Sequence, residues 1–309
     1  MDNNLQLPRI SIITPSYNQG HFIEETICSV LQQNYPNLEY IVIDGGSTDN
    51  TVDIIKRYES QISYWVSEPD RGQTHAINKG LKRATGEILA YINSDDYYLP
   101  GTLHAVAEYF RNYPEIDLLH GRCCYVDAHG ESIGEQFGNI HTFEEIIDLW
   151  SIWWRKQQFV QPEVFWTRRI SDRVGAFNES LYFVMDYEYW SRILQAGGTV
   201  GRLDRQLSCF RFTQTQKSAQ SFKVADELLS VVKPWLWDSS TPIAWKKRFA
   251  LQGQWLYQVV FLKQLEQSVN AGEHRWIRYL KSANTLLSHP KLLFSFGLHQ
   301  RFQKILLQR

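Results

Sequence analysis

Residues 86–96 read GEILAYINSDD, an apolar run that ends in an amide and two carboxylates. Short apolar runs bounded by polar residues are typical of buried strands. In open α/β sheets, ligands bind beyond the carboxyl ends of such strands. Hard divalent cations prefer oxygen ligands, so Asp95 and Asp96 predict a strand end that binds a metal. The alternative is a helix cap, because Asp is a favoured N-cap residue and a helix is expected near Pro100.

The residues before this stretch alternate between strand and helix patterns. β-Branched runs predict strands, and apolar residues at helical spacing predict the helices between them. The expected strands are 10–13, 38–43, 62–66 and 88–92, and the expected helices are 21–33, 49–58 and 74–84. Such alternation predicts a parallel sheet whose right-handed crossovers bring every carboxyl strand end to one rim. That rim collects the polar residues 14–16, 44, 68–70 and 93–96.

Beyond residue 100 the pattern becomes mixed. It predicts a hairpin of 118–126 with 132–137, a short strand at 164–166, a helix at 186–196 and a last strand at 207–212. From about residue 218 the pattern is helical and rich in Trp. We therefore expect an α/β domain with a mixed, mostly parallel sheet over 1–217, followed by a helical extension over 218–309.

Charge is distributed unevenly along the 309 residues. Residues 1–242 carry 21 Lys+Arg and 31 Asp+Glu, a net −10, whereas residues 243–309 carry 11 Lys+Arg and 2 Asp+Glu, a net +9. Such asymmetry predicts a basic extension with its own partner. The four cysteines lack zinc-ligand spacing and are interpreted as reduced and structural. We find no leader pattern and no apolar run near the ~18 residues that span a bilayer, so a cytoplasmic location is expected.

The polar rim segments fit either a ligand site or local turns. The segment 14–18 leads into a helix N-terminus, which is a natural anion site. Asp44 is placed to accept from a uracil N3–H, or else forms an Asx turn, and Asp49 fits either the site or a helix cap. Arg71 and Gln73 are placed to reach phosphate. The dinucleotide fingerprint and the Walker loop are both absent, which argues against a dinucleotide enzyme.

Taken together, six segments resemble the family-two glycosyltransferases, which have the glycosyltransferase-A fold. They are TPSYN at 14–18, DGGSTD at 44–49, SEPDRGQ at 67–73, AINKG at 76–80, TGEI at 85–88, and NSDD at 93–96 with Pro100. The resemblance is strong over about residues 8–125, weaker to about 213, and does not cover the C-terminal helices. It implies a three-layer α/β sandwich with a nucleotide-sugar half and an acceptor half, and inversion of the anomeric centre.

The resemblance also implies roles for individual rim residues. Asp44 matches the residue that reads the base. Asp95 matches the second acid of the family's Asp-x-Asp motif, which implies Mg²⁺ or Mn²⁺ as cofactor. Asn93 stands where the first Asp is usual, leaving fewer charges at the metal. The implied donor-binding residues are Thr14, Pro15, Ser16, Asn18, Asp44, Gly45, Ser47, Asp70, Arg71, Gln73, Asn78, Asn93, Ser94 and Asp95.

The acceptor half carries the implied catalytic base. The segment 185–192 looks like the family's acidic motif at a helix start, in which Asp186 matches the general base; the alternative is a capping acid favoured by the helix dipole. The implied acceptor-binding residues are Gln161, Pro162, Glu163, Glu188 and Trp154, the last by ring stacking or else as core. The segment 211–213 lacks the family's His, so a leaving-group role for Arg211 or Lys217 is weakly supported.

The function that the resemblance implies is metal-dependent, inverting transfer of a sugar from a nucleoside-diphosphate sugar, typically UDP-linked. The expected acceptor is a hydroxyl of a saccharide or lipid-linked saccharide, in polysaccharide or glycolipid synthesis. A sugar-nucleotide nucleotidyltransferase and a non-catalytic binding module are the alternatives. No nucleic-acid partner is expected. The basic extension is interpreted as contacting an anionic membrane surface at the inner face of the cell membrane, or as a flap or dimer interface.

Overall fold

The computed structural model describes residues 7–155, 157–213, 216–217 and 221–300. The chain divides into two compact units. The first comprises Met1–Ile146 and Ser151–Val224, and the second comprises Ile147–Trp150 and Ala225–Arg309. The division therefore falls within helix α8 (Ser221–Trp237), slightly beyond the boundary expected at residues 217–218.

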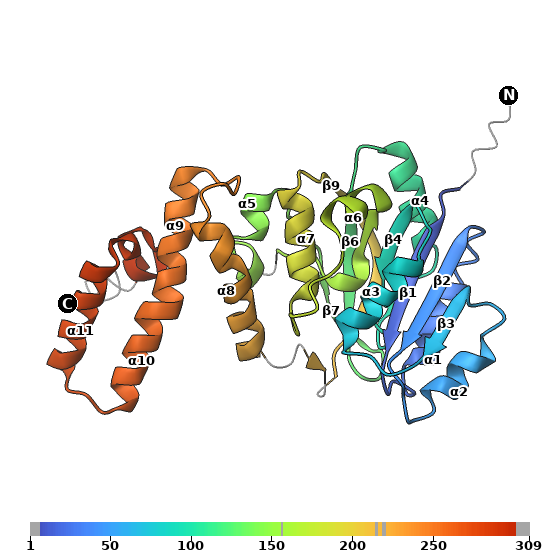
Figure 1. The fold of residues 1–309 in the computed structure, drawn as a ribbon, viewed down its shortest axis with the longest axis horizontal. Coiled ribbons are helices and arrows are strands. Elements are labelled where there is room, and N and C mark those ends of the chain that lie inside the picture. Colours follow the sequence, from blue (N-terminus) through green and yellow to red (C-terminus); the bar gives the residue numbers. More distant parts are fainter. Residues whose placement is uncertain (1–6, 156, 214–215, 218–220, 301–309) are drawn as a thin grey trace. The chain divides into compact units, whose positions relative to one another are not determined.

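A parallel sheet forms the N-terminal half of the first unit (Figure 1). Its strands are β1 (Ile10–Ser16), β2 (Leu38–Asp44), β3 (Tyr64–Ser67) and β4 (Ile88–Tyr91). β1 pairs with β2 and β4, and β2 pairs with β3, all in parallel. Ser16 is in register with Asp44, which is in register with Ser67, so these strands end level with one another. This confirms the predicted rim as a feature of the fold.

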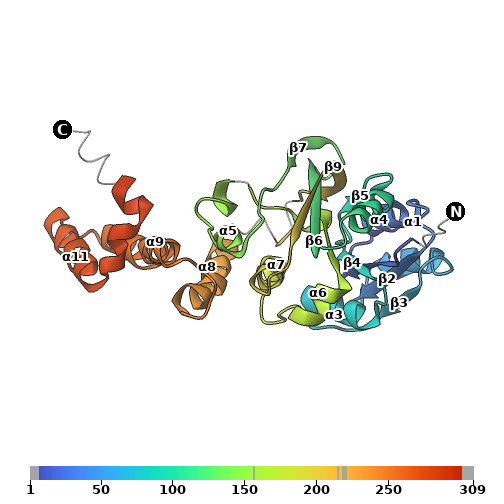
Figure 2. The same ribbon diagram turned by 90° about the horizontal axis from the view of Figure 1, so that it is seen from above.

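Helices cover both faces of this sheet. They are α1 (Ile23–Leu31), α2 (Thr51–Arg57), α3 (Gln73–Arg83), α4 (Thr102–Asn112) and α6 (Arg168–Val174). Figure 2 shows α1 and α4 on one face and α3 and α6 on the other, which confirms the three-layer prediction. Strands covered on both faces read as continuous apolar runs, as β4 does. A Cβ at Gly80 would lie 2.5 Å from Ile13 Cγ2, so glycine lets α3 approach β1 closely.

The second half of the sheet is mixed. Its strands are β5 (Tyr97–Tyr98), β6 (Leu118–Val126), β7 (Ser132–Gln136), β8 (Val164–Thr167) and β9 (Val200–Arg211). Among the described residues the sheet order is β3-β2-β1-β4-β8-β6-β9-β5, with β7 added beside β6. The predicted hairpin is confirmed as β6 and β7. The last strand begins earlier than expected, and the two-residue β5, which pairs only with β9, is too short for periodicity to reveal.

The remaining helices of the first unit are short except for one. They are α5 (Phe143–Ile146), the 3₁₀ turns η1 (Trp153–Arg155) and η2 (Gln161–Glu163), and α7 (Met185–Gln195). The predicted helix at 186–196 is confirmed as α7. It packs its apolar side inward, where Tyr187, Trp190 and Ile193 are buried. The first turn of α7 carries two acids, Asp186 and Glu188.

The second unit is helical. Its elements are most of α8, α9 (Trp245–Leu256), the π-helical segment η4 (Tyr257–Leu262), α10 (Lys263–Asn270), α11 (Arg275–Ser288) and η5 (Pro290–Phe294). The Trp255 indole donates to the Leu229 carbonyl at 2.9 Å, which ties α9 to α8. A Cβ at Gly253 would lie 2.3 Å from the Lys291 carbonyl, so η5 packs closely on α9. No helix among the described residues has both the length and the apolar character needed to cross a membrane.

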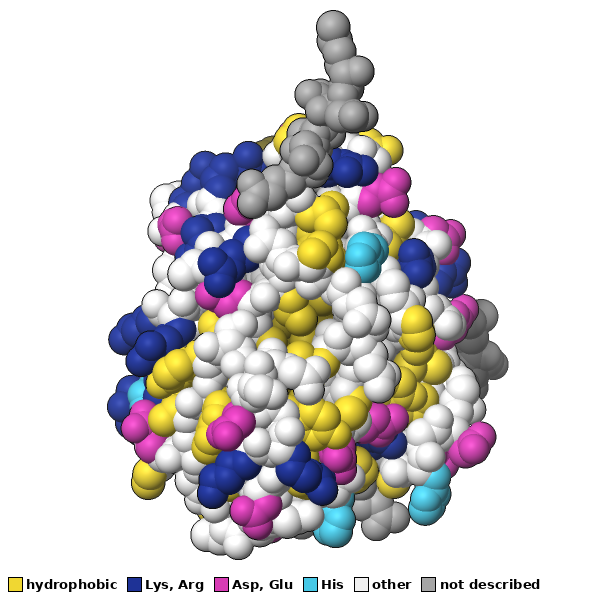
Figure 3. Space-filling view, turned by 90° about the vertical axis from the view of Figure 1, so that its right-hand side faces the viewer, with side chains coloured by type: hydrophobic (Ala, Val, Ile, Leu, Met, Phe, Trp, Pro, Cys, Tyr) yellow, Lys and Arg dark blue, Asp and Glu magenta, His cyan; other side chains and the backbone are white. Residues whose placement is uncertain are grey.

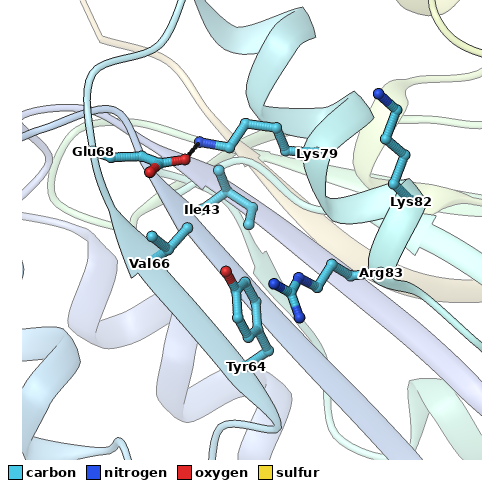
Figure 4. A pocket seen from close by; sticks show the side chains of 7 residues that line it. All are labelled: Ile43, Tyr64, Val66, Glu68, Lys79, Lys82 and Arg83. Carbon is cyan, nitrogen blue, oxygen red and sulfur yellow. Dashed lines mark hydrogen bonds and ion pairs between the residues drawn. The ribbon is translucent and has the colours of Figure 1, made fainter.

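A pocket of about 500 Å³ lies beside the edge strand β3 (Figure 4). It is lined by residues of β2, β3, the start of the loop after β3, and α3: Ile43, Tyr64, Val66, Glu68, Lys79, Lys82 and Arg83. Figure 4 shows Arg83 beside the Tyr64 ring, with its guanidinium carbon 3.9 Å from the ring centroid, and Lys79 paired with Glu68. Figure 3 shows apolar side chains recessed near the centre of one face of the first unit. The pocket borders the rim at Glu68 only.

Candidate active site

The loops that follow β1 and β2 are tied together by hydrogen bonds. The Asn18 N–H donates to Ser47 Oγ at 2.7 Å, and the Thr48 N–H donates to Asn18 Oδ1 at 2.9 Å. Asn18 has a φ of 52°, a left-handed conformation that Asn tolerates better than most residues. Asp49 accepts from the Gly20 N–H at 2.9 Å and from the first N–H of α2 at 3.0 Å. The N-cap position itself is Asn50, so Asp49 supports the helix start from one residue before the expected cap.

Asp44 lies at the end of β2 and is fully buried. Its carboxylate accepts from the Gly46 and Ser47 N–H groups at 3.1 and 2.9 Å, and from the hydroxyls of Ser47 and Ser67 at 2.5 and 2.6 Å. These are the contacts of an Asx turn, and they fix the turn in one conformation. Recognition of the nucleotide base by Asp44 stays a prediction. The carboxylate that would recognise the base is already held in place by four hydrogen-bond donors.

Two of the predicted donor-binding residues support the rim from within. Thr14 is fully buried, and its hydroxyl lies 3.1 Å from the Tyr40 hydroxyl, so its side chain faces the core and not a ligand. Asn78 is also buried, and its amide exchanges hydrogen bonds of 2.9 Å with both backbone groups of Phe177. Asn78 therefore braces the loop before α7 and does not extend a group into the rim. Pro15, Ser16 and Ser94 are buried as well.

The loop after β3 reaches toward the acceptor half. Asp70 accepts from the Gly72 N–H at 2.7 Å and lies against Gly45, where a Cβ would come within 2.8 Å of its carboxylate. Arg71 forms an ion pair of 2.6 Å with Glu179, which belongs to the loop that Asn78 braces. The Arg71 side chain is 69% exposed, so solvent screens this pair and a ligand anion can compete for the guanidinium.

A chain of amides crosses the rim from the donor loop to the acceptor half. Lys217 Nζ donates to Gln73 Oε1 at 3.2 Å, and Gln73 Nε2 donates to Asn93 Oδ1 at 2.6 Å. Asn93 Nδ2 donates to Gln161 Oε1 at 3.0 Å, and Gln161 Nε2 donates to the Tyr91 carbonyl at 2.5 Å. The structure therefore brings together three predicted site residues, and it places Lys217 beside them.

The loop after β4 is held by Arg211, at the end of β9. The Arg211 N–H donates to Asp96 Oδ1 at 2.9 Å, and its Nε donates to the Asp95 carbonyl at 3.0 Å. The buried Arg211 guanidinium pairs with Glu25 at 2.5 Å. Asp96 is buried, and burial, then the neighbouring Asp95 charge, raises its pKa well above the usual range. Arg211 and Asp96 thus shape the loop from inside.

The Asp95 carboxylate is the rim group that fits a divalent cation. Burial raises the pKa of Asp95, with Arg211 opposing, so the carboxylate is desolvated without a matching positive partner in contact. Among the described residues, no side chain donates a hydrogen bond to it, and no three His, Cys, Asp or Glu side chains cluster as a complete metal cage. One carboxylate plus substrate phosphates is an arrangement that Mg²⁺ commonly uses. The residues present therefore fit a cation that is completed by a diphosphate.

Asp186 lies in the first turn of α7, and its Oδ1 accepts from the Tyr187 N–H at 2.7 Å. Burial first, and then the charges of Asp186 and Asp96, raise the pKa of Tyr91 well above its usual range. Glu188 instead pairs with Arg192 at 2.8 Å within α7, so an acceptor contact of Glu188 gains no support.

Glu163 was predicted to bind the acceptor, but it lies inside the protein. It is fully buried, its Oε1 accepts from the Val160 N–H at 2.8 Å, and its Oε2 has no partner among the described residues. Burial raises the pKa of Glu163 well above its usual range. The residue therefore closes the turn η2 from a fully buried position, and an acceptor contact of Glu163 gains no support. Pro162 is buried beside it, whereas Trp154 is 40% exposed and remains accessible for stacking.

Sequence reasoning gave Lys217 only weak support and missed Tyr182. Lys217 Nζ lies 4.1 Å from the centroid of the Tyr182 ring, which is 54% exposed. The hydrogen bond between Lys217 and Gln73 joins residues 144 positions apart. No local pattern marks such a contact, because it depends on how β9 ends relative to α3.

A parallel sheet with a polar rim, a cation-compatible Asp95 and an acidic helix start defines the class of glycosyltransferases with the glycosyltransferase-A fold. Residues 11–177 match the model described as glycosyl transferase family 2, and the chain belongs to that family. It is 41% identical over 134 residues, 42% of this chain and 50% of the relative, to TuaG of Bacillus subtilis, a glycosyltransferase provisionally assigned to teichuronic acid biosynthesis.

Other comparisons agree on the fold. An uncharacterized glycosyltransferase of Rickettsia typhi is 28% identical over 63% of this chain and 61% of its own length. S. aureus TarS 1–349 with UDP-GlcNAc has a TM-score of 0.63 and 17% identity, over 90% of this chain and 79% of that one. The mannosyltransferase PcManGT of Pyrobaculum calidifontis with GDP-Man and Mn²⁺ has a TM-score of 0.60 and 19% identity, over 94% and 84%. The chain thus spans 50% and 61% of the length of these two curated relatives.

Proposed function

We propose that this protein is an inverting glycosyltransferase that moves a sugar from a nucleoside-diphosphate sugar to a hydroxyl acceptor. The observation that carries the proposal is the polar chain at the rim, where Lys217, Gln73 and Asn93 are joined two residues before Asp95. Asp186, in the first turn of α7, is the acid that we add to this site from its match to the family motif. Packing of the sheet requires none of these polar groups at the surface, whereas transfer from a diphosphate requires a cation, an anion contact and a base.

Asp186 is assigned as the general base that takes the proton of the acceptor hydroxyl. Attack comes from the face opposite the leaving diphosphate, which inverts the anomeric carbon. Lys217 and Arg71 supply positive charge beside the donor loop, and Gln73 orients the Lys217 amine through its Oε1. When bound at Asp95, Mg²⁺ or Mn²⁺ would offset charge that develops on the departing diphosphate. Asp44 and the tied loops after β1 and β2 form a rigid wall for the nucleotide.

The donor and acceptor classes follow from the relatives as proposals. The solved structures bind UDP-GlcNAc or GDP-Man, which supports a nucleoside-diphosphate sugar without choosing its base. TuaG's assignment to teichuronic acid biosynthesis supports a polysaccharide of the cell envelope as the product. Trp154, which is 40% exposed in η1, is our candidate for stacking on the acceptor sugar.

Asp186→Asn tests the assignment. The variant should lose turnover by a factor on the order of 10²–10⁴, the usual contribution of a positioned base, and should still bind UDP with Mn²⁺ in calorimetry. Glu188→Gln is the matched control, because Glu188 lies one half-turn further along the same helix and pairs with Arg192; its turnover should change far less. Near-normal turnover by Asp186→Asn would refute the catalytic role.

The products separate the alternatives. Release of a nucleoside diphosphate from a nucleotide sugar supports transfer. Release of pyrophosphate from a nucleoside triphosphate and a sugar phosphate would instead identify a nucleotidyltransferase. Binding of nucleotide sugars without turnover, over a panel of donors and saccharide acceptors, would favour a binding module.

A further inference from the structure

Helix α11 presents an apolar stripe to solvent. Trp276, Leu280 and Leu287 are 72%, 71% and 82% exposed. Their spacing of four and then seven residues places them on one side of a helix with 3.6 residues per turn. Ile277 and Tyr279 widen the stripe and are also exposed. Large apolar side chains gathered in this way on a surface mark an interaction site.

The opposite side of α11 is the one that packs within the unit. It carries Arg278, Ser282, Thr285 and Leu286, of which Thr285 is the buried member. The Thr285 hydroxyl donates to Gln264 of α10. The helix therefore turns a largely polar side inward and its apolar side outward, the reverse of an ordinary surface helix. The residues of this unit that the structure describes, up to residue 300, do not cover the stripe, which can therefore meet an occupant from outside the unit.

Positive charge borders the stripe. Arg275 and Lys281 are exposed on its two sides. A second aromatic group lies in the same unit, where Trp245, Phe249 and Phe294 make ring contacts of 6.3 and 5.8 Å between centroids. Lys246 and Lys291 lie 5.5 and 5.1 Å from the rings of Trp245 and Phe249. Apolar side chains with Lys and Arg at their margins are typical of a helix that lies in a lipid interface.

We propose that α11 rests on an anionic lipid surface, with its Trp276–Leu280–Leu287 stripe in the interfacial region. Residues 243–300 carry 8 Lys+Arg and 2 Asp+Glu, a net +6. Two copies that met through this region would bring like charges together, whereas an anionic bilayer attracts them. The 14 residues of α11 are about 21 Å long, shorter than a hydrocarbon core of about 30 Å, so the helix lies along the surface.

Flotation of the full chain with vesicles tests this proposal. The protein should float with phosphatidylcholine vesicles that contain one third phosphatidylglycerol, and should stay at the bottom with phosphatidylcholine alone. The stripe variant W276S/L280S/L287S should lose binding at least about tenfold, since it removes the inserted side chains. The charge variant R275Q/K281Q should bind more weakly and with a shallower dependence on salt.

The matched control is Y113S/I133S, which removes two exposed apolar side chains from the first unit and should float as the wild type does. Circular dichroism and UDP binding identify any variant that fails to fold. Equal flotation of the stripe variant and the wild type would overturn the proposal. A wild-type protein that does not bind anionic vesicles would also overturn the proposal. Light scattering would then show whether the stripe instead joins two copies, in which case the wild type is a dimer and the stripe variant a monomer.

Discussion

Replacement of Arg211 by Met should loosen the loop that carries Asp95 and Asp96. Arg211 is 3% exposed at its side chain and donates to the backbone carbonyls of Asp95, Asp127 and Ala128 at 3.0, 3.4 and 3.3 Å. Met keeps much of the apolar volume and removes every side-chain donor, while the backbone N–H that donates to Asp96 stays. The part-buried Asp95 carbonyl would then lose the guanidinium that now satisfies it, whereas the carbonyls of Asp127 and the exposed Ala128 could bond to solvent instead.

The expected magnitude follows from the unequal quality of these contacts. The bond to Asp95 is well formed, and a bond from a charged donor contributes about 1.5–3 kcal/mol. The two longer bonds are weaker. The ion pair with Glu25 contributes about 1 kcal/mol or less, because the Glu25 side chain is 54% exposed and solvent screens it. Arg211→Met should therefore cost about 3 kcal/mol locally, most of it from the bond to the Asp95 carbonyl.

Hydrogen exchange read by mass spectrometry is the suitable assay, because a chain of two units need not unfold in one transition. Peptides covering residues 92–98 and 121–130 should exchange at least about 100-fold faster in Arg211→Met, since 1.4 kcal/mol corresponds to tenfold. Peptides from α9 to α11 should not change. Glu25→Gln is the control and should accelerate the same peptides less than about tenfold.

The reasoning fails if Arg211→Met leaves exchange in residues 92–98 within a few-fold of the wild type. It fails also if Glu25→Gln accelerates exchange as much as Arg211→Met does. In that second case the exposed ion pair, and not the backbone carbonyls, would be what holds the loop.

Two further predictions concern single carboxyl groups. Asp95→Ala should abolish the Mn²⁺-dependent part of UDP binding in calorimetry while the circular dichroism spectrum persists, and Asp49→Ala serves as an acidic control; unchanged binding by Asp95→Ala would contradict the cation site. Burial raises the pKa of Glu163 above its ordinary value of 4.5, so above pH 4.5 the folded chain keeps a proton that the unfolded chain releases. The contribution of Glu163 to the stability of the wild type therefore falls as pH rises. Glu163→Gln should therefore gain in melting temperature over the wild type as pH rises from 4.5 to 7; a difference that does not change with pH would refute this.

Much of the fold could be predicted because its signals are local. The apolar run before Asn93 and the β-branched runs of β1 and β2 are buried on both faces, so each carries its own evidence. The level strand ends follow from parallel crossovers, and they predicted the rim that Asp44 and Asp95 share. The helix start at Asp186 could be predicted for the same reason.

The side-chain roles that could not be predicted depend on distant partners. Glu163 stands beside Gln161 in sequence, yet one is sealed in a turn and the other reaches the rim, because η2 turns their side chains to different sides. The Thr14 side chain lies in the core because its hydroxyl meets that of Tyr40 on the neighbouring strand β2, a contact between residues 26 positions apart. Arg211 and Lys217 are separated by a few residues, but only the end of β9 decides that one braces Asp96 from inside and the other meets Gln73 at the surface.

The amide chain across the rim has a fixed direction. At one end the Tyr91 carbonyl can only accept, and at the other the Lys217 ammonium can only donate. Every amide between them must therefore point the same way, with Asn93 giving its NH₂ to Gln161 and its oxygen to Gln73. An aspartate at position 93 has no NH₂ to give, so it would face the Gln161 oxygen. The residue at 93 and the residue at 161 are thus chemically interdependent, and the asparagine that departs from the family's usual acid is the one its neighbours can accommodate.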